Sequence, residues 1–311
     1  GLVLLFHKMG ELDGAFGDWG FHKGGNGGFT QVLARAAEAY GADIMKNAGV
    51  SQVITKNGEA VGVVLENGDE HYAGIVVSAL DPRHTFLNLV EPRELPTDLV
   101  DNIRKYKFQG VSAKVNFALD GLPEYPALPG QADIYRGFIN IAPSIDYIER
   151  AFDEAKYGDF SSKPYIDGCI QSTLDPDLTP PGKHVMSCFV QYCPYMLKNS
   201  DWDSERDNLS DTVQKTLESY FPGFSDLVIH REVVTPLDIE RTVGLSEGNI
   251  FAGEFLGPQM YFFRPAPGWN QYRTPIRGYY QCGSGTHPGG CVIGGPGKLA
   301  AEQILGDVKK P

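Results

Sequence analysis

Two glycine-rich loops, each followed by a helical pattern, constrain the fold of this chain more than any other feature. The C-terminal one runs from a short predicted strand, 278–282, through the loop 283–290 into an alanine-rich helix over 292–305. The N-terminal one, 24–28, precedes apolar residues at helical spacing over 29–40. Such loops offer backbone N–H groups and the positive end of a helix dipole to a ligand. If both serve one ligand, the two ends build one domain around the middle of the chain; the alternative is that the glycines only make turns.

Neither loop has the spacing of a nucleotide-phosphate motif. Gly294–Lys298 is followed by Leu299, where a phosphate loop needs Ser or Thr to hold Mg²⁺. Neither glycine run completes the Gly-x-Gly-x-x-Gly pattern, because Thr30 and Pro288 stand at its last position. The sequence therefore does not encode a stand-alone Rossmann site.

The residues between the two loops predict further sheets. The apolar run 74–80 predicts a strand buried on both faces of a largely parallel sheet, and the turn Asn67–Gly68 predicts a hairpin of 60–65 with 71–72. An antiparallel sheet is predicted from the alternating segments 112–119, 134–141, 165–172 and 185–192. Helical patterns cover 144–157 and 204–220. The fold class that follows is α/β combined with α+β.

Charge and hydropathy exclude several classes of function. The formal net charge is −12, which is the wrong sign for a protein that coats nucleic acid or an anionic membrane. No apolar run approaches the ~20 residues that span a bilayer. We therefore expect no nucleic-acid partner and no transmembrane span, while peripheral contact with a membrane stays open. The chain begins inside an apolar stretch without an initiating Met, which we interpret as a fragment or a processed product.

The five cysteines favour a reducing compartment, either the cytoplasm or, for a eukaryotic source, the mitochondrial matrix. They form no Cys-x-x-Cys pair, and the histidines have no metal-ligand spacing, so no metal site is expected. Cys188 and Cys193 lie in one predicted strand. Their offset of five places the two thiols on opposite faces, with α-carbons on the order of 16 Å apart, too far for a redox disulfide.

The C-terminal stretch carries a family resemblance. Residues 278–301, GYYQCGSGTHPGGCVIGGPGKLAA, resemble the closing flavin-binding motif of phytoene dehydrogenase-like proteins, a branch of the amine-oxidase and carotenoid-desaturase superfamily. Further segments agree with that family along the whole chain: 17–20 with the loop 24–29, 76–79, 174–176, 180–182, 236–240 and 248–251. Cys291 stands where the family pattern usually has glycine.

The resemblance implies a partial glutathione-reductase-like FAD domain interrupted by a substrate domain with a mixed or antiparallel sheet and flanking helices. Residues 24–80 and 276–311 would belong to the FAD domain, and 81–275 to the substrate domain, whose sheet would wall an apolar cavity. Residues 1–23 would end a substrate or cap segment. Family members also carry an N-terminal ADP-binding βαβ unit. That unit is expected as a partner portion of the same protein, and whether this chain retains FAD alone stays open.

The resemblance also implies which residues approach FAD. The Val50 backbone would meet the adenine, and Ala79 would lie near the pyrophosphate or ribose. Val292 and Ile293 would donate backbone N–H groups to the pyrimidine oxygen of the flavin. The remaining expected cofactor residues lie in the two glycine loops: Gly25, Gly27, Gly283, Gly285, Thr286, Gly289 and Gly290.

Individual side chains have competing interpretations. His287 is a candidate for orienting substrate or tuning the flavin, but a hydrogen bond to a loop carbonyl is favoured. Trp19 and Tyr195 are candidates for the substrate face, against an ordinary role in the core. Asp238 and Glu240 are expected to serve a helix start rather than to act as an acid/base pair. No catalytic base is identified.

The resulting hypothesis is that the chain is the C-terminal part of an FAD-dependent oxidoreductase. Hydride would pass between the flavin and a small apolar substrate of isoprenoid-like or lipid-like type. The alternative is a non-catalytic interaction or regulatory protein, or a fragment, that does not bind FAD by itself.

Overall fold

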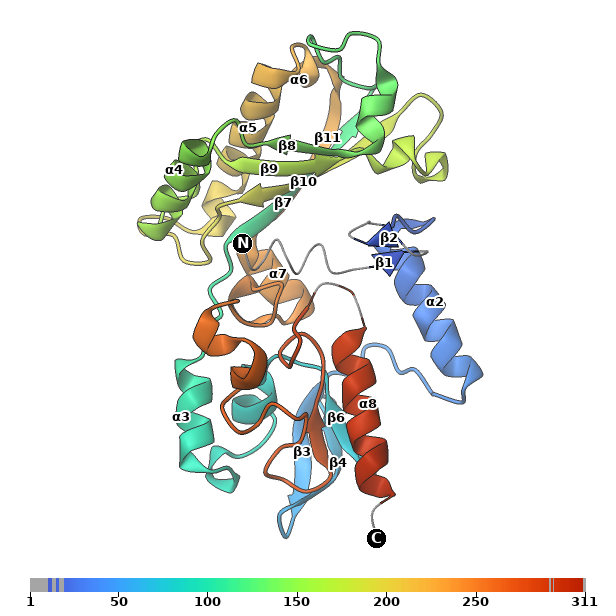
Figure 1. Ribbon diagram of the computed structural model, residues 1–311, viewed down its shortest axis with the longest axis vertical. Coiled ribbons are helices and arrows are strands. Elements are labelled where there is room, and N and C mark those ends of the chain that lie inside the picture. Colours follow the sequence, from blue (N-terminus) through green and yellow to red (C-terminus); the bar gives the residue numbers. More distant parts are fainter. Residues whose placement is uncertain (1–10, 13–14, 17–19, 291, 293, 310–311) are drawn as a thin grey trace. The chain divides into compact units, whose positions relative to one another are not determined.

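The computed structural model describes residues 11–12, 15–16, 20–290, 292 and 294–309. The chain divides into two compact units, each built from separate stretches of sequence (Figure 1). Unit 1 comprises the described residues of 1–19, 44–109 and 244–311, and unit 2 comprises 20–43 and 110–243. These bounds differ from the ranges expected from the sequence, whose assignment to an FAD domain and a substrate domain stays a prediction.

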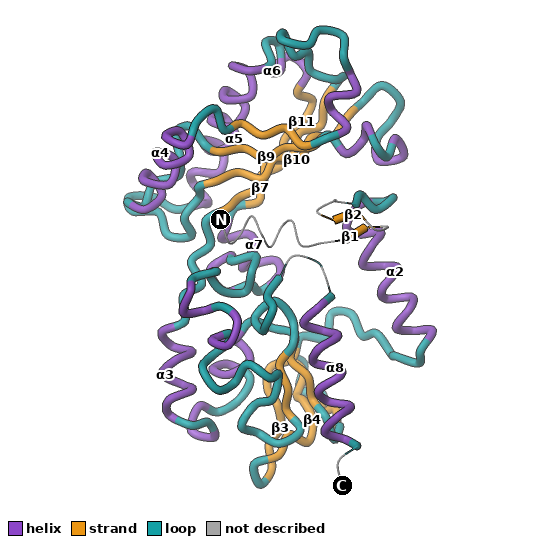
Figure 2. Tube along the Cα trace, viewed as in Figure 1, coloured by secondary structure: helices purple, strands orange, loops and turns teal. Residues whose placement is uncertain are grey.

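Unit 2 contains a five-stranded antiparallel sheet in the order β11-β7-β10-β9-β8 (Figure 2). Its strands are β7 (Ser112–Leu119), β8 (Phe138–Ile141), β9 (Tyr165–Cys169), β10 (His184–Gln191) and β11 (Val228–Val234). Along β7, Val115 and Phe117 are buried while Lys114 is exposed, which is the period-two pattern of a sheet with one packed face. The antiparallel sheet predicted for the middle of the chain is confirmed.

The core of unit 2 forms where helices pack on that sheet. The helices of the unit are α2 (Gly25–Ala39), α4 (Ile145–Lys156), α5 (Trp202–Tyr220), α6 (Phe224–Leu227) and α7 (Pro236–Val243). Leu209, Val213 and Leu217, one face of α5, join Val115 and Phe117 in a single buried cluster.

Unit 1 contains a hairpin-based antiparallel sheet of β3 (Val50–Lys56), β4 (Glu59–Leu65) and β5 (Glu70–Tyr72). Asn57–Gly58 joins β3 to β4, and both residues have positive φ, as a tight two-residue hairpin turn requires. The predicted hairpin across Asn67–Gly68 is confirmed by the pairing of β4 with β5. Two short strands, β1 (Glu11–Leu12) and β2 (Ala15–Phe16), form a separate antiparallel pair.

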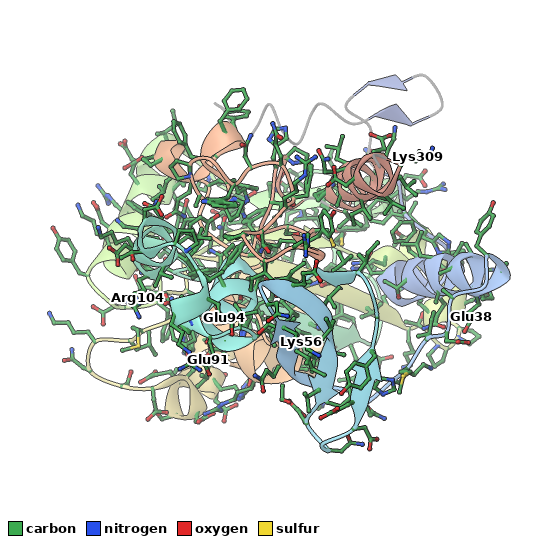
Figure 3. All side chains as sticks on the ribbon, turned by 90° about the horizontal axis from the view of Figure 1, so that it is seen from below. Glu38, Lys56, Glu91, Glu94, Arg104 and Lys309 are labelled. Atoms are coloured by element: carbon green, nitrogen blue, oxygen red, sulfur yellow. The ribbon has the colours of Figure 1, made fainter. Side chains whose placement is uncertain are left out.

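The pair that positions the candidate site is parallel. β6 (Val76–Ser78) pairs in parallel with β12 (Tyr279–Gln281), and α8 (Gly295–Val308) follows β12 in the chain. Figures 1 and 3 show α3 (Thr97–Lys105), marked by Arg104, and α8, whose end is marked by Lys309, on opposite sides of the unit.

The burial predicted for the run 74–80 is wrong, although its parallel pairing is confirmed. Val77 is 44% exposed and Leu80 is 43% exposed. Among the described residues this parallel sheet has only two strands. A continuous apolar run predicts a strand suited to burial on both faces; it does not supply the covering layers.

Candidate functional site

The candidate site lies at the carboxyl end of the parallel pair β6–β12, where ligands bind in open α/β sheets. The Cys282 N–H donates to the Ser78 carbonyl at 2.8 Å, so the two strands end together. Beyond them the loop 283–290 packs on the turn after β6. A β-carbon at Gly283, whose φ is +80°, would lie 2.8 Å from the Ala79 carbonyl oxygen, and one at Gly285 would lie 2.7 Å from Pro82 Cδ.

The loop is also held by its own residues. Thr286 is buried, and both its N–H and its hydroxyl donate to the Gly283 carbonyl, at 3.0 and 2.9 Å. A β-carbon at Gly289 would lie 2.7 Å from the Phe255 ring, and one at Gly290 would lie 3.3 Å from an oxygen of Ser284. The protein's own packing therefore accounts for the glycines of this loop, and their approach to a cofactor stays a prediction.

The turn after β6 is fixed by a buried carboxylate. Asp81 is 2% exposed and accepts hydrogen bonds from the N–H groups of His84, at 3.0 Å, and Ser246, at 2.9 Å. Next to it, Arg83 forms an ion pair with Glu247 at 2.6 Å. Asp81 thus connects the end of β6 to the segment that leads toward β12, which keeps both sides of the site rigid.

The start of α8 has no side-chain cap. Its N-cap residue, Gly294, has a φ of +66° and no side chain to accept a hydrogen bond, and its first turn contains no acidic residue. A β-carbon at Gly294 or Gly297 would meet no atom within 4 Å. Val292 is 81% exposed. The first N–H groups of a helix need acceptors from outside it, so this end suits an anion or an electron-rich carbonyl oxygen.

Two buried polar atoms next to the site have no partner among the residues that the structure describes. They are Nδ1 of His287 and Oε1 of Gln281. The loop-carbonyl bond favoured for the His287 side chain is therefore not made by Nδ1 in the described part of the chain. The residue is instead held through its backbone, because the Tyr272 hydroxyl donates to the His287 carbonyl at 2.9 Å.

These features fit a flavin. Its pyrimidine edge presents acceptors to helix-start N–H groups, and its ring nitrogens can meet orphaned polar atoms. Cys291 and Ile293 lie outside the described residues, so the expected role of Ile293 stays a prediction.

The sequence analysis missed the residue that ties the loop to the rest of unit 1. Arg264 is completely buried, and two of its N–H groups donate to the Ser284 carbonyl at 2.8 and 2.9 Å. The available signal was an arginine inside the otherwise apolar and aromatic run 260–269. Spacing alone did not link it to the loop.

The other expected cofactor residues are only partly near this site. Ala79 lies in it, while Val50 is half-buried at the start of β3. Gly25 and Gly27 lie in unit 2, in the first turn of α2, where a β-carbon would meet no atom within 4 Å. The N–H of Gly24, just before α2, donates to the Asp175 carboxylate at 2.7 Å. One donor of this loop is thus already bonded within the protein.

The two candidates for the substrate face, Trp19 and Tyr195, and the neighbouring Asp238 differ in their surroundings. Trp19 lies outside the described residues. The Tyr195 hydroxyl donates to the Glu240 carboxylate. Asp238 stands in the first turn of α7, where it accepts from the Thr235 N–H at 2.8 Å and from Arg206 at 2.7 Å. Partial burial raises the pKa of Asp238, but the bonds from Arg206 and Thr235 together outweigh it and hold the pKa below its usual value.

The sheet face of unit 2 opposite α5 is mixed in character. Asn116 donates to Glu232 at 3.0 Å and accepts from the Ser187 hydroxyl at 2.7 Å. Phe189, half-buried, stands in register between Lys114 and Asp167. A ligand on this face would meet polar as well as apolar groups.

Metal-ligating clusters, membrane-spanning helices and reactive thiols are the other features that bear on function. Within the described ranges no group of three or more His, Cys, Asp or Glu side chains could hold a metal ion. In the same part of the chain, no helix combines the length and hydropathy needed to cross a membrane. Cys188 and Cys193 are free and completely buried, and burial raises the pKa of both thiols.

Comparison with known proteins gave a family and several relatives. The model of the family described as "Flavin containing amine oxidoreductase" matches residues 3–305. The "Pyridine nucleotide-disulfide oxidoreductase domain-containing protein 2" of Rattus norvegicus is 40% identical over 99% of this chain and 55% of its own length. The "Phytoene desaturase (lycopene-forming)" of a Paracoccus species is 25% identical over 99% of this chain and 58% of its own length. The chain thus spans about half the length of the curated relatives it matches.

Solved structures agree on the fold. An oxidoreductase from Methanosarcina mazei superposes with a TM-score of 0.59 at 18% identity, covering 91% of this chain and 55% of the other. Putrescine oxidase bound to putrescine superposes with a TM-score of 0.53 at 16% identity, covering 92% of this chain and 54% of the other.

Proposed function

The chain belongs to the family of flavin-containing amine oxidoreductases, and from this premise we propose that it is a flavin-binding part of an FAD-dependent oxidoreductase. The observation that carries the proposal is the start of α8, which has no side-chain cap and follows the glycine loop at the end of two parallel strands. The loop 283–290 and the first turn of α8 would hold the flavin.

In this proposal a bound flavin supplies the acceptor or donor of a hydride, and the chain's own residues do the holding. The N–H groups at the start of α8 would bond the electron-rich edge of the ring. Val292 would donate its backbone N–H to the pyrimidine oxygen at that edge. His287 Nδ1 and Gln281 Oε1 would find partners in the cofactor or in an ordered water.

The proposal also covers the remaining FAD contacts and the substrate. We infer that Gly25, Gly27 and Val50 are FAD contacts in the intact protein, which would also include an ADP-binding portion. The substrate would be a small, mainly apolar molecule, in keeping with the printed name of the Paracoccus relative. Polar groups on the sheet face that includes Asn116 and Ser187 would allow it one polar end.

The proposal is tested by placing a negative charge at the start of α8. Gly297→Asp puts a carboxylate in the first turn, where a β-carbon has free space and an acidic residue stabilises the helix. We expect this variant to fold at least as well as the parent chain but to bind FAD about tenfold more weakly, which corresponds to ~1.4 kcal/mol. Equilibrium titration of FAD, followed by its absorbance and fluorescence, measures the affinity.

Gly306→Asp is the matched control, because Gly306 lies near the other end of the same helix and also has free space. Its FAD affinity should equal that of the parent chain. Equal affinities for Gly297→Asp and Gly306→Asp would remove the start of α8 from the flavin site. Failure of the parent chain to bind FAD would favour a non-catalytic or fragment role.

A further inference from the structure

Arg264 is a buried guanidinium that contacts no carboxylate among the residues described. Its exposed fraction is 0%, and burial lowers its pKa. A buried charge without a counter-ion is retained only where hydrogen bonds replace its lost hydration. The hydrogen-bond acceptors of Arg264 therefore show which segments the side chain holds together.

All the hydrogen bonds of Arg264 go to backbone carbonyls from separate stretches of unit 1. Nη1 donates to the Gln259 carbonyl at 3.2 Å. Nη2 donates to the Phe251 carbonyl and, at 3.4 Å, to that of Gly253. Nε and Nη2 both donate to Ser284, at 2.9 and 2.8 Å. The guanidinium thus joins the segment 251–259 to the glycine loop.

Aromatic rings fix the orientation of the guanidinium. Its central carbon lies 5.1 Å from the centre of the Phe255 ring and 5.9 Å from that of Tyr106. Both distances are in the range of a cation–π contact. Gly289 packs against Phe255 and has no room for a β-carbon, which would lie 2.7 Å from that ring. The rings therefore keep the fork of the arginine turned toward the loop.

The two hydrogen bonds that the Ser284 carbonyl accepts also orient the N–H of the next residue. In a planar trans peptide the carbonyl and the N–H point in opposite directions. Since the Ser284 carbonyl points at the guanidinium, the Gly285 N–H points away from it. No acceptor for that N–H is found in the part of the chain that the structure describes.

We propose that Arg264 is a positioning residue for the flavin loop: it fixes the Ser284–Gly285 peptide so that the Gly285 N–H is presented to the cofactor. This inference rests on the proposed function and deepens it. An arginine is required because its planar fork places two donors on one carbonyl while others reach a second segment. Lysine keeps the charge but not the fork, and glutamine keeps neither.

The test compares Arg264→Gln, Arg264→Lys and two controls in the same chain. Arg104→Gln removes an exposed arginine of α3, labelled in Figure 3, whose side chain makes no hydrogen bond to the loop in the described part of the chain. Leu99→Ala opens a cavity in the core of unit 1 and controls for lost stability. The first readout is the amide exchange rate of 284–286 without FAD, where the Thr286 N–H is bonded to Gly283. The second is FAD affinity.

We expect Arg264→Gln to raise exchange in the loop and to weaken FAD binding, each about tenfold. Arg264→Lys should lie between this variant and the parent chain, because the retained charge rescues part of the bonding. Leu99→Ala should change exchange evenly across unit 1 without a specific loss of FAD affinity, and Arg104→Gln should change neither readout.

Two results would overturn the inference. The first is an Arg264→Gln variant whose loop exchange matches that of Leu99→Ala. The second is faster loop exchange in Arg264→Gln with an unchanged FAD affinity, which would make the bond to Ser284 structural only. If no variant and not even the parent chain binds FAD, the proposed function fails, and with it the cofactor-presenting role of Arg264. The exchange data would then still show whether Arg264 orders the loop.

Discussion

At the scale of single residues, the glycines of this chain divide into two kinds. Gly283 is required by its backbone conformation and by the Ala79 carbonyl beside it, whereas Gly297 faces open space. Of these two, only Gly283 was expected from the sequence to approach the cofactor, because spacing does not show what surrounds a missing side chain. Only the first kind has an internal reason to be glycine, so the second is the better indication of an external ligand.

Gly283→Ala should therefore destabilise unit 1. The new methyl group meets the Ala79 oxygen and the residue must keep a φ of +80°, so we expect a loss of about 1–3 kcal/mol. Gly297→Ala, in a helical position with free space, should gain up to ~1 kcal/mol. Urea unfolding followed by circular dichroism measures both. A Gly283→Ala variant as stable as Gly297→Ala would contradict the packing described for the loop.

Some roles of single residues could be predicted from the sequence pattern and others could not. The Gly-rich loop and its polar members could be predicted from sequence, but Arg264 could not, since its role depends on carbonyls distant along the chain. In the same way, the exposure of Val77 depends on a covering layer and not on the strand itself.

At the scale of elements, helices were predicted well because their signals are local. The pattern over 144–157 became α4, and its N-cap Ser144 accepts the Tyr147 N–H. The pattern over 204–220 became α5, capped by Asp201. The helix expected over 29–40 begins earlier, at Gly25. The first three residues of the strand expected over 134–141 belong to a 3₁₀ turn, 132–136, since short aromatic runs fit either form.

Helix α8 is tied down at its far end by one acidic residue. Asp307 accepts from Arg273 Nε at 2.7 Å and from the Tyr280 hydroxyl at 3.1 Å. The bond from Arg273 is the chief reason that the pKa of Asp307 is lowered to about 2. A lowered carboxyl pKa means that the bond stabilises the fold above the unfolded value of about 3.9 and is lost as the pH falls toward the folded value.

Asp307→Asn should therefore lower stability at pH 7 by up to ~1 kcal/mol, because the ion pair is partly exposed. The difference between variant and parent should shrink as the pH is lowered from 4 to 2. Urea midpoints at pH 7, 4 and 2 measure it. Glu302→Gln, which removes an exposed carboxylate on the same helix, is the control. A difference that stays constant with pH would contradict the bond between Asp307 and Arg273.

At the scale of the whole molecule, the chain combines a unit that carries the glycine loop 283–290 with a second unit built on an antiparallel sheet. The composition and the motif were sufficient to predict the family, since the closing motif is long and specific. They were not sufficient to predict the unit boundaries, because strands and loops from distant stretches join each unit. The printed name of the rat relative mentions a disulfide. Cys188 lies in β10 and Cys193 lies two residues beyond its end, so the single strand predicted for both is wrong, and both are free thiols.

Alkylation of the native protein should leave Cys188 and Cys193 unmodified at pH 8. Both thiols are completely buried and their raised pKa keeps them protonated. Half-buried Cys169 and Cys282 should react slowly, and all should react after denaturation. Peptide mass spectrometry with iodoacetamide measures this. Rapid native labelling of Cys188, or a mass increase on reduction that reveals a Cys188–Cys193 bond, would contradict the described sheet.

The most direct test of the central claim is a hydrogen-exchange map of the chain with and without FAD. The account predicts that saturating FAD slows exchange in the loop 283–290 and in the first turn of α8, and leaves the far end of that helix near Asp307 unchanged. A map in which FAD leaves these residues unprotected, or protects only residues distant from the β6–β12 pair, would contradict the claim that this loop and helix start hold the flavin.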